Sequence, residues 1–435
     1  MDVLAAALSA ADPFRAVDTA LKLDEEVIQI LASVQPDGDI FVVGAGKAGT
    51  SMAVAVEKAL GDRVTGGLVI VKDGYAGTVG APLRHITLRE GAHPVPDARG
   101  VEATRELISL IESAGERDLV ICLISGGGSA LLTLPGSQVT LEDVQAVTAL
   151  LLKSGATINE LNAVRKHLSR ESGGQLARIA APARVLSLIL SDVTGSPLDV
   201  IASGPTVPDP TTYADALAVL ALYDLLARVP ANVLAHLEAG KRGDLPETPK
   251  DGDPLFSRVT NKLVASNVQA VESAAMMARH LGFNTSIIST SLEGEARVVG
   301  ADLARLARGV AEHGTPVQTP ACLLFGGETT VTVRGSGVGG RNTELALSAA
   351  IHLSGLGPRV LVASLATDGG DGTSPSAGGL VDGTTVERGA GLGLDVQSFL
   401  DNNDSYSYLA AVGDVIMTGP TGTNVNDIIG VFAFG

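Results

Sequence analysis

The sequence predicts an α/β protein of two domains, and three observations carry this prediction. Short aliphatic runs alternate with amphipathic stretches along most of the chain, which is typical of parallel strands with helices on both faces of the sheet. Hydrophobic residues make up 45% of the sequence, which supports a large core and argues against a disordered chain. The length of 435 residues corresponds to two or three domains at about 150 residues each.

Buried strands are predicted in the N-terminal half, and each runs into a loop that contains glycine. Their sequences are DIFVVGAG, GGLVIVKDG, RDLVICLISGGG and ARVLSLILSDVTG. The helices predicted between and after them cover residues 47–60, 99–114, 141–154, 158–168 and 212–222. Parallel sheets bind ligands at the carboxyl ends of their strands, so these glycine loops are the first candidates for a functional site.

A domain boundary is predicted at residues 240–254, because GKRGDLPETPKDGDP is rich in glycine, proline and charge and lacks apolar periodicity. After this segment the pattern resumes. We therefore expect domains at 1–245 and 255–435, with a cleft between them. The second domain is predicted to contain the strands KLVASN, FNTSIIS, ACLLFGG, TTVTVRG and PRVLVASLA and the helices 267–281, 295–313 and 341–353.

Charge and composition exclude several classes of protein. The net charge of −17 would repel a phosphate backbone, so no nucleic-acid partner is expected. The amino terminus lacks a basic region, and the longest uncharged stretch, 119–141, contains three adjacent glycines and a proline. We therefore expect neither a signal peptide nor a membrane span. Cys122 and Cys322 lie in apolar runs and are expected to be core thiols of a cytoplasmic protein.

The first glycine loop, GAGKAG at residues 44–49, follows a strand and opens a helix. It satisfies the GxGxxG fingerprint of dinucleotide sites, with Asp73 as a possible ribose ligand. Lys47 inside the turn instead favours a phosphate group or a developing phosphoryl charge, because its ammonium would join the amides at the helix start. The alternative interpretation of Lys47 is a solvated surface lysine on a tight turn.

The second and third loops also follow strands. In SGGGS, residues 125–129, three glycines let backbone amides approach an anion and two hydroxyls can complete the contact, although a glycine triplet can also serve only as a tight turn. In the third loop, LSDVTGSPLDVIASGPT, Asp192 could hold Mg²⁺ or act as a base. A turn or helix-capping aspartate is the alternative for Asp192.

The C-terminal half offers three further candidates. Glu328 follows two glycines, and Arg341 opens a helix after a flexible glycine run, so its guanidinium could swing onto a phosphate or carboxylate. The alternative is an exposed arginine at a helix start. Asp368 and Asp371, in DGGDG, fit a site for a metal and a nucleotide, but aspartate-glycine loops are also ordinary turns.

Several expected signatures are absent from the sequence. No GxxxxGK[ST] motif appears, which excludes a P-loop NTPase, and GxSxG, CxxC and HExxH are also missing. His93 in GAHPVPD and His167 in RKHLS are the only histidines among residues that look like a site. A lone histidine is more often structural, so neither belongs to the predicted site.

Taken together, the motifs resemble a known family. VVGAGKAG, GAHPVPD, ISGGGSALL, LNAVRKHLS, LSDVTG, IASGPT, GGETTVTV, GGRNTELAL, ATDGGDG, DSY and TGPTGTNVND occur in this order over nearly the whole chain. This set is similar to that of the glycerate 2-kinases of the MOFRL type. The resemblance implies a Rossmann-like N-terminal domain, a smaller C-terminal α/β domain and an active site in the cleft between them.

The resemblance also implies an activity. Members of the family transfer a phosphoryl group from ATP to the 2-hydroxyl of D-glycerate, which gives 2-phosphoglycerate and ADP. The catalytic lysine and arginine of the family correspond to Lys47 and Arg341. Where the family usually has an acidic residue, this chain has Ser196, so Asp192 would carry more of the role in catalysis and Mg²⁺ binding. A homodimer also stays open.

Binding of glycerate and ATP is predicted for the remaining residues of these loops. They are Gly44, Gly46, Ser125, Gly126, Gly127, Gly128, Ser129, Glu328, Asn342, Asp368 and Asp371.

Two other functions remain open. The first is a hydroxypyruvate reductase that uses NAD(P)H, a label that relatives of the family also carry, supported here by GxGxxG and Asp73. The second is a protein that binds phosphorylated acids without catalysis, because loops such as SGGGS also hold phospho-sugars.

Overall fold

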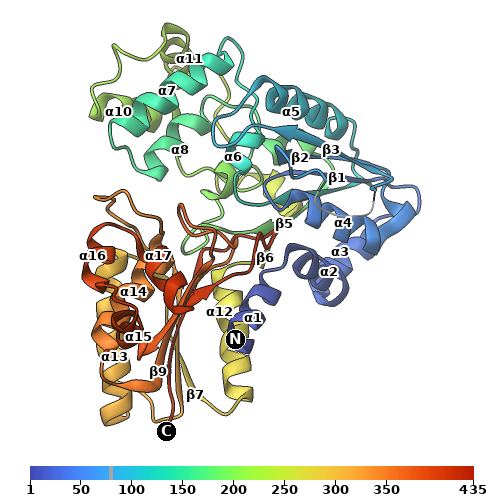
Figure 1. Ribbon diagram of the computed structural model, residues 1–435. Helices are drawn as coiled ribbons and strands as arrows, with labels where there is room; N and C mark the ends of the chain where they lie inside the picture. The colour runs from blue at the N-terminus through green and yellow to red at the C-terminus, as the bar shows by residue number, and fades with distance from the viewer. Residues whose placement is uncertain (78–81) are drawn as a thin grey trace. The chain divides into compact units, whose positions relative to one another are not determined.

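A computed structural model describes residues 1–77 and 82–435. The chain forms two compact units, and each is described by itself (Figure 1). We call Pro13–Val264 the N-terminal unit, and Met1–Asp12 together with Ala265–Gly435 the C-terminal unit. Both units contain a sheet with helices packed on it, which confirms the predicted α/β architecture of two domains.

The division between the units lies between Val264 and Ala265, beyond the predicted boundary segment 240–254. That segment belongs to the N-terminal unit. Glu247 contacts His167, which directly follows α8 (Ile158–Lys166), and the Thr248 hydroxyl donates to Asp209. The first residues of the chain lie in the C-terminal unit, where α1 (Asp2–Ala10) packs on α12 (Asn267–His280). The local composition of residues 1–12 does not indicate that they pack in the C-terminal unit.

The N-terminal unit is built on a six-stranded sheet of order β3-β2-β1-β4-β5-β6. The pairings from β3 to β5 are parallel, with Val43 opposite both Leu68 and Cys122. Continuous apolar runs form these strands because both faces are covered. The strands are β1 (Ile40–Ala45), β2 (Gly66–Lys72), β3 (Ile86–Gly91), β4 (Leu119–Ile124), β5 (Arg184–Leu190) and β6 (Val259–Ala265).

Helices cover both faces of this sheet, with α5 on one face and α4 on the other (Figure 1). Helices α7, α8, α10 and α11 form a separate apolar cluster around Val147, Leu168 and Leu220. The helices of the unit are α2 (Pro13–Leu23), α3 (Glu25–Ser33), α4 (Gly49–Leu60), α5 (Ala98–Ile111), α6 (Gly128–Leu131), α7 (Leu141–Lys153), α8 (Ile158–Lys166), α9 (Gln175–Ala180), α10 (Tyr213–Leu222) and α11 (Ala231–Lys241).

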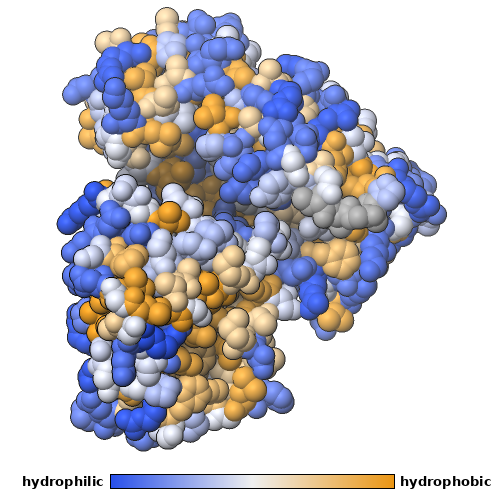
Figure 2. Space-filling model, in the orientation of Figure 1, coloured by the Kyte–Doolittle hydropathy of each residue, from blue (hydrophilic) through white to orange (hydrophobic). Residues whose placement is uncertain are grey.

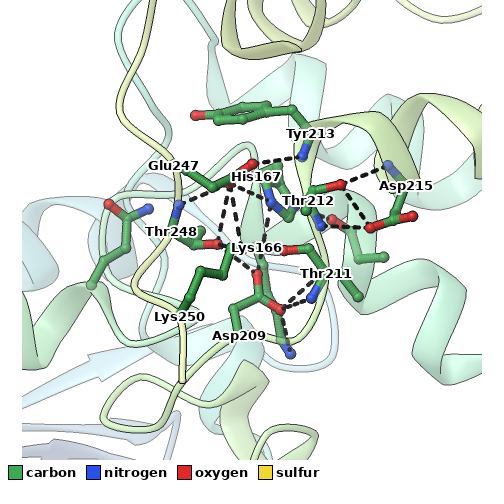
Figure 3. A network of polar contacts seen from close by, with 12 residues as sticks. Lys166, His167, Asp209, Thr211, Thr212, Tyr213, Asp215, Glu247, Thr248 and Lys250 are labelled. Carbon is green, nitrogen blue, oxygen red and sulfur yellow. Dashed lines mark hydrogen bonds and ion pairs between the residues drawn. The ribbon is translucent and has the colours of Figure 1, made fainter. Parts of the chain in front are cut away.

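A buried network of charged side chains joins the end of α8 to residues 209–212 and 247–250 (Figure 3). The His167 ring places Nδ1 2.7 Å from the carbonyl oxygen of Ala163 and Nε2 3.0 Å from the carboxylate of Glu247. Both neighbours are hydrogen-bond acceptors, so the ring makes two polar contacts inside the protein. His167 therefore has a structural role, as a lone histidine usually does.

Glu247 gives this network a dependence on pH. Burial opposes its charge, but hydrogen bonds from His167 and from the amides of Thr248 and Tyr213 outweigh burial and lower its pKa from 4.5 to about 2. A carboxylate with a lowered pKa stabilises the fold above the unfolded value, and this stabilisation is lost as the pH falls from about 4.5 to about 2.

Glu247→Gln is therefore expected to lower the free energy of unfolding at pH 7 by about 1–2 kcal/mol, allowing for partial exposure to solvent. The difference between the two proteins should shrink as the pH falls below 4.5 and vanish near pH 2. Chemical unfolding followed by circular dichroism measures this difference. Glu238→Gln, an exposed change on neighbouring α11, should be neutral at every pH; a constant difference for Glu247→Gln would contradict the prediction.

The C-terminal unit also has a six-stranded sheet, of order β11-β10-β9-β12-β8-β7. The β7–β8 pairing is parallel and the other pairings are antiparallel, so this sheet is mixed, a detail that the prediction of a smaller α/β domain left open. A buried central strand is apolar whichever way its neighbours run. The strands are β7 (Asn284–Leu292), β8 (Ala321–Gly327), β9 (Gly357–Ala366), β10 (Gly378–Gly383), β11 (Val415–Ile416) and β12 (Asp427–Ala433).

Helices α13 and α14 cover one face of the second sheet, and α12 lies on the other with α1 against it (Figure 1). The predicted strand TTVTVRG is wrong, since this segment forms only an isolated bridge between Thr330 and Glu295. The helices are α12, α13 (Ala296–His313), α14 (Arg341–Leu353), α15 (Thr385–Gly391), α16 (Val396–Asp401) and α17 (Ser405–Val412).

Polar and charged side chains cover most of the face shown in Figure 2, with smaller apolar patches between them. Among the helices that the structure describes, none is long and apolar enough to cross a membrane. Cys122 and Cys322 lie fully buried in separate sheets, and burial raises the pKa of each thiol to about 12. Their prediction as core thiols is confirmed.

Candidate active site

The loop after β4 offers two backbone donors. Gly126 and Gly127 follow the buried strand, and Gly127 adopts a left-handed conformation at φ 83° that favours glycine. Within the described part of the chain, neither amide N–H donates a hydrogen bond, whereas Gly128 N–H donates to Ser125 O at 3.1 Å. Two adjacent free donors form a small nest for an anion.

Lys47 and His93 lie beside this nest. A Cβ atom at Gly127 would lie 2.9 Å from Cδ2 and 3.1 Å from Nε2 of His93, and 3.5 Å from Cε of Lys47. The Lys47 ammonium has no hydrogen bond or ion pair with the residues that the structure describes, although its side chain is half-buried. An unpaired cation beside free amide donors suits a negatively charged ligand.

His93 carries no charge at neutral pH. Burial and the positive charges of Lys47 and Lys72 lower its pKa from 6.5 to about 4. A neutral imidazole has one nitrogen with a lone pair, so it can accept a proton or a hydrogen bond. Sequence reasoning left His93 out of the site, although it occurs in the GAHPVPD motif.

Residues 44–49 do not supply amide donors, in contrast to the prediction. The N–H groups of Gly46, Lys47 and Ala48 donate to Ile70 O, Gly126 O and Ser125 Oγ at 3.0, 2.9 and 3.1 Å. These bonds hold the first loop against the second, so Gly44 and Gly46 serve the packing of two strands. The loop therefore positions Lys47, and its amides are already occupied.

The two serine hydroxyls of residues 125–129 also make contacts inside the protein. Ser125 is buried and accepts from Ala48, while Ser129 Oγ lies 2.9 Å from Ser203 Oγ, which in turn donates to Asn162 at 3.3 Å. These hydrogen bonds hold the loop 125–129 against neighbouring residues of the N-terminal unit. Binding of a ligand by either hydroxyl stays a prediction.

Asp192 lies against the same loop. A Cβ atom at Gly126 would lie only 2.5 Å from Cγ of the Asp192 carboxylate, so only glycine fits there without displacing it. No group of three or more metal-binding side chains occurs in the described residues. Mg²⁺ usually takes one or two carboxylates, with substrate phosphates and water completing its shell, so a single Asp192 fits such an ion.

The C-terminal unit fixes Arg341 at the first position of α14. Its Nε and Nη2 donate to both carboxylate oxygens of Asp427 at 2.6 and 2.8 Å, and Nη1 lies 3.3 Å from the exposed Glu328. Although burial opposes the charge, the bond to Asp427 raises the pKa of the guanidinium above its usual range. Asp427 is buried at the start of β12 and was not foreseen from the sequence.

Hydrogen bonds fix the glycine run before Arg341. The prediction that a flexible run lets the guanidinium of Arg341 move onto a ligand is therefore wrong. Arg334 N–H and Gly335 N–H donate to Asn403 Oδ1 at 2.7 and 3.0 Å, and Val338 N–H donates to Asp404 Oδ1 at 2.9 Å. Arg341 is held in place from both sides, by this run and by Asp427.

Asp371 and Asn342 are buried beneath the start of α14. The Asp371 carboxylate accepts from the amides of Asn342 and Thr343 at 2.9 and 2.8 Å and from the Thr343 hydroxyl at 2.7 Å, which caps the helix. Asp368 is exposed and accepts from Gly370 N–H at 3.0 Å. Direct binding of substrate by Asp368, Asp371 or Asn342 stays a prediction.

Asp73, the ribose ligand of the alternative dinucleotide reading, is paired with Arg99. Arg99 Nη1 and Nη2 donate to its two carboxylate oxygens at 2.7 and 2.8 Å. A ribose would have to displace this fork-shaped pair. Together with the occupied amides of residues 46–48, this pairing weakens the case for a dinucleotide site.

Comparison with known proteins places the chain in a family. Residues 1–238 match a family model described as a domain of unknown function (DUF4147), and residues 321–427 match the MOFRL family. The chain is 45% identical to the glycerate 2-kinase of Pyrococcus horikoshii over 425 residues, which cover 97% of this chain and 94% of that protein. The chain belongs to the MOFRL-type glycerate kinase family.

Two further proteins match this chain over nearly its full length. The crystal structure of glycerate kinase from Thermotoga maritima has a TM-score of 0.90 and 41% identity, covering 99% of this chain and 98% of that chain. A relative from Agrobacterium vitis, 43% identical over 95% of this chain and 92% of its own length, bears the name of a hydroxypyruvate reductase. The resemblance predicted from the motifs is confirmed.

Proposed function

We propose that the protein is a D-glycerate 2-kinase, which transfers the γ-phosphoryl group of ATP to the 2-hydroxyl of D-glycerate and releases ADP. Full-length similarity to glycerate kinases supports this function. The observation that carries it is the unpaired Lys47 ammonium beside the free amides of Gly126 and Gly127. This arrangement suits an anion that gains charge during a reaction.

In the proposed reaction the 2-hydroxyl oxygen bonds to the γ-phosphorus while the bond from that phosphorus to the β–γ bridging oxygen breaks. ADP leaves with the electron pair, and the hydroxyl proton passes to a base. The protein contributes mainly positioning and neutralisation of charge in such a transfer. Lys47 and Arg341 are the cations proposed to stabilise the moving phosphoryl group, and Gly126 and Gly127 hold an anionic oxygen.

Mg²⁺, when bound with the nucleotide, neutralises charge on the phosphate oxygens, and Asp192 is the proposed ligand. The place of Asp192 against Gly126 supports this role. The loop geometry would then hold the metal ligand and the anion nest together.

His93 is the proposed acceptor of the hydroxyl proton. Its ring lies beside Gly127 and Lys47, and its pKa of about 4 keeps it unprotonated at neutral pH. His93→Asn is expected to lower kcat by about 10²- to 10³-fold, in the range for loss of a general base, with little change in KM for ATP. An unchanged kcat in a folded variant would remove His93 from the mechanism; His280→Asn, at the exposed end of α12, is the control.

Gly126→Ala tests the link between the loop and Asp192. The added methyl group would displace the Asp192 carboxylate, so kcat is expected to fall by about 10-fold or more, at a cost of about 1–3 kcal/mol in stability. Gly115→Ala is a matched control, because its Cβ would lie 3.6 Å from Asp118 Oδ2, an ordinary contact. Steady-state kinetics and thermal melting measure both effects, and wild-type kcat in Gly126→Ala would contradict the role of this loop.

A direct assay separates this function from its rivals. Purified protein is incubated with Mg-ATP and D-glycerate, with L-glycerate as control, and ³¹P NMR distinguishes 2-phosphoglycerate from 3-phosphoglycerate. A second arm offers hydroxypyruvate with NADH and NADPH, since one relative bears a reductase name. Formation of 2-phosphoglycerate supports the kinase, and loss of NADH supports the reductase. Activity in neither arm would favour a binding protein.

A further inference from the structure

The C-terminal unit contains a cavity of about 400 Å³, and the residues that line it all belong to this unit. It is lined by residues after β8, by the glycine run before α14 and by residues 372–373, and Arg341 belongs to its wall. Ligand cavities for drug-sized molecules span about 300–1,000 Å³. Glycerate has only seven heavy atoms, so a cavity of this size suits a larger ligand.

The floor of the cavity is rigid. Glu344 lies there with an exposed fraction of 1%, and Arg297 Nε and Asn403 Nδ2 donate to its two oxygens, each at 2.8 Å. One wall consists of Gly337, Gly339 and Gly340, which belong to the segment 334–340, and amides of this segment donate to Asn402, Asn403 and Asp404. Because these groups are already ordered, a ligand would bind without the entropy cost of ordering a loop.

The lining combines three kinds of chemistry. Val331 and Val333 offer apolar surface, and Val333 is 74% exposed at the rim. The hydroxyls of Thr330 and Thr373 donate to the carbonyl oxygens of Gly294 and Gly339 at 3.3 and 3.2 Å, so to a ligand they offer oxygen lone pairs. Arg341 offers a guanidinium. Arg341 Nε and Nη2 donate to the buried Asp427, while Nη1 pairs with the exposed Glu328 at 3.3 Å. Exposed ion pairs are weak, so a phosphate can displace Glu328.

We propose that this cavity is the nucleotide subsite, with the base on the valines, the ribose near the threonines and the phosphates on Nη1 and Nη2 of Arg341. The inference rests on the proposed kinase function and deepens it, because it assigns the nucleotide to the C-terminal unit. Glycerate is thereby left to the free amides of Gly126 and Gly127.

Photolabelling of the full chain with 8-azido-ATP and Mg²⁺, followed by peptide mapping, tests the assignment without altering the fold. Label is expected in 329–345, 372–373 or 403, with competition by ATP and not by D-glycerate. Label confined to 44–49 or 125–129, or no label that ATP competes away, would overturn the proposal.

A matched pair of variants gives a quantitative test. Val331→Trp should fill the cavity, whereas Val338→Trp changes a neighbouring residue that is not part of the lining. Calorimetry with a non-hydrolysable ATP analogue is expected to show at least a tenfold rise in Kd for Val331→Trp and less than a twofold rise for Val338→Trp. KM for ATP should rise in parallel, and KM for glycerate should stay within twofold.

Equal effects in the two variants, or a rise in KM for glycerate instead of ATP, would overturn the subsite. These results are distinct from failure of the proposed function. Phosphorylation of glycerate with label outside the cavity would support the kinase function and reject the nucleotide subsite. Specific label in the cavity without phosphorylation of glycerate would support the nucleotide subsite and reject the kinase function. Should Val331→Trp not fold, the labelling pattern of the wild-type chain decides alone.

Discussion

Lys47→Ala is expected to lower kcat by about three orders of magnitude while the fold is retained. Removal of one group that stabilises developing charge typically costs about 10²- to 10³-fold, and a cation on a moving phosphoryl group is at the upper end. The Lys47 ammonium has no partner among the described residues, so its removal leaves no buried charge unpaired. Steady-state kinetics with both substrates and a thermal melt measure the two sides of this prediction.

Lys58→Ala is the matched control. Lys58 lies on α4, the helix that follows the Lys47 loop, and its ammonium sits 5.0 Å from the centre of the Phe14 ring. Its loss removes a comparable side chain from the same region and should leave kcat unchanged. Equal losses of activity in the two variants would indicate a general disturbance of the region around α4 and contradict a specific role for Lys47.

His93 gives a readout that does not depend on turnover. Burial is the largest cause of its low pKa, and the charge of Lys47 is the next. In Lys47→Ala the pKa of His93 should therefore rise from about 4 toward 6.5 without reaching it. Titration of the ring protons by NMR measures the change, and an unchanged pKa would contradict the proximity of the two side chains.

Most elements of the fold were predictable because their signals are local. Helices α7, α8 and α10 begin at threonines 140, 157 and 212, whose hydroxyls accept amide hydrogen bonds in capping boxes, and their predicted starts agree within one residue. The direction of the strands in the C-terminal unit was not predictable. The strands β9 and β12 are buried in the centre of the sheet, and a central strand is apolar whether its neighbours are parallel or antiparallel. The segment TTVTVRG has the alternating pattern of a strand. At its end, however, the amides of Arg334 and Gly335 donate to Asn403 Oδ1 and not to a neighbouring strand.

The candidate site divides in the same way. Gly126, Gly127 and Lys47 are singled out by local glycine patterns, since a left-handed turn after a buried strand needs glycine. Asp427 lies 86 residues from Arg341, and no pattern around TNVND links it to an arginine. His93 is recognised only through its place beside Gly127 and Lys47 and through the pKa that burial and charge impose on it.

Arg341→Lys is expected to lower kcat by about 10²-fold or more, even though the positive charge is kept. Lysine cannot donate through Nε and Nη2 to both oxygens of Asp427 and at the same time offer Nη1 to a phosphate.

The same argument makes Asp427 a positioning residue. In Asp427→Asn the guanidinium loses its ionic partner, so kcat should fall with little change in KM for glycerate.

Stability must be separated from catalysis, because breaking a buried ion pair typically costs about 3–5 kcal/mol. Arg388→Lys provides the matched control, since Arg388 Nη2 binds both oxygens of Asp414 at 2.8 and 2.6 Å in the same unit and outside the candidate site. Both lysine variants should lower the melting temperature, whereas only Arg341→Lys should lose turnover. If Arg388→Lys lost as much activity as Arg341→Lys, the effect would belong to stability, and the catalytic role of the Arg341–Asp427 pair would be rejected.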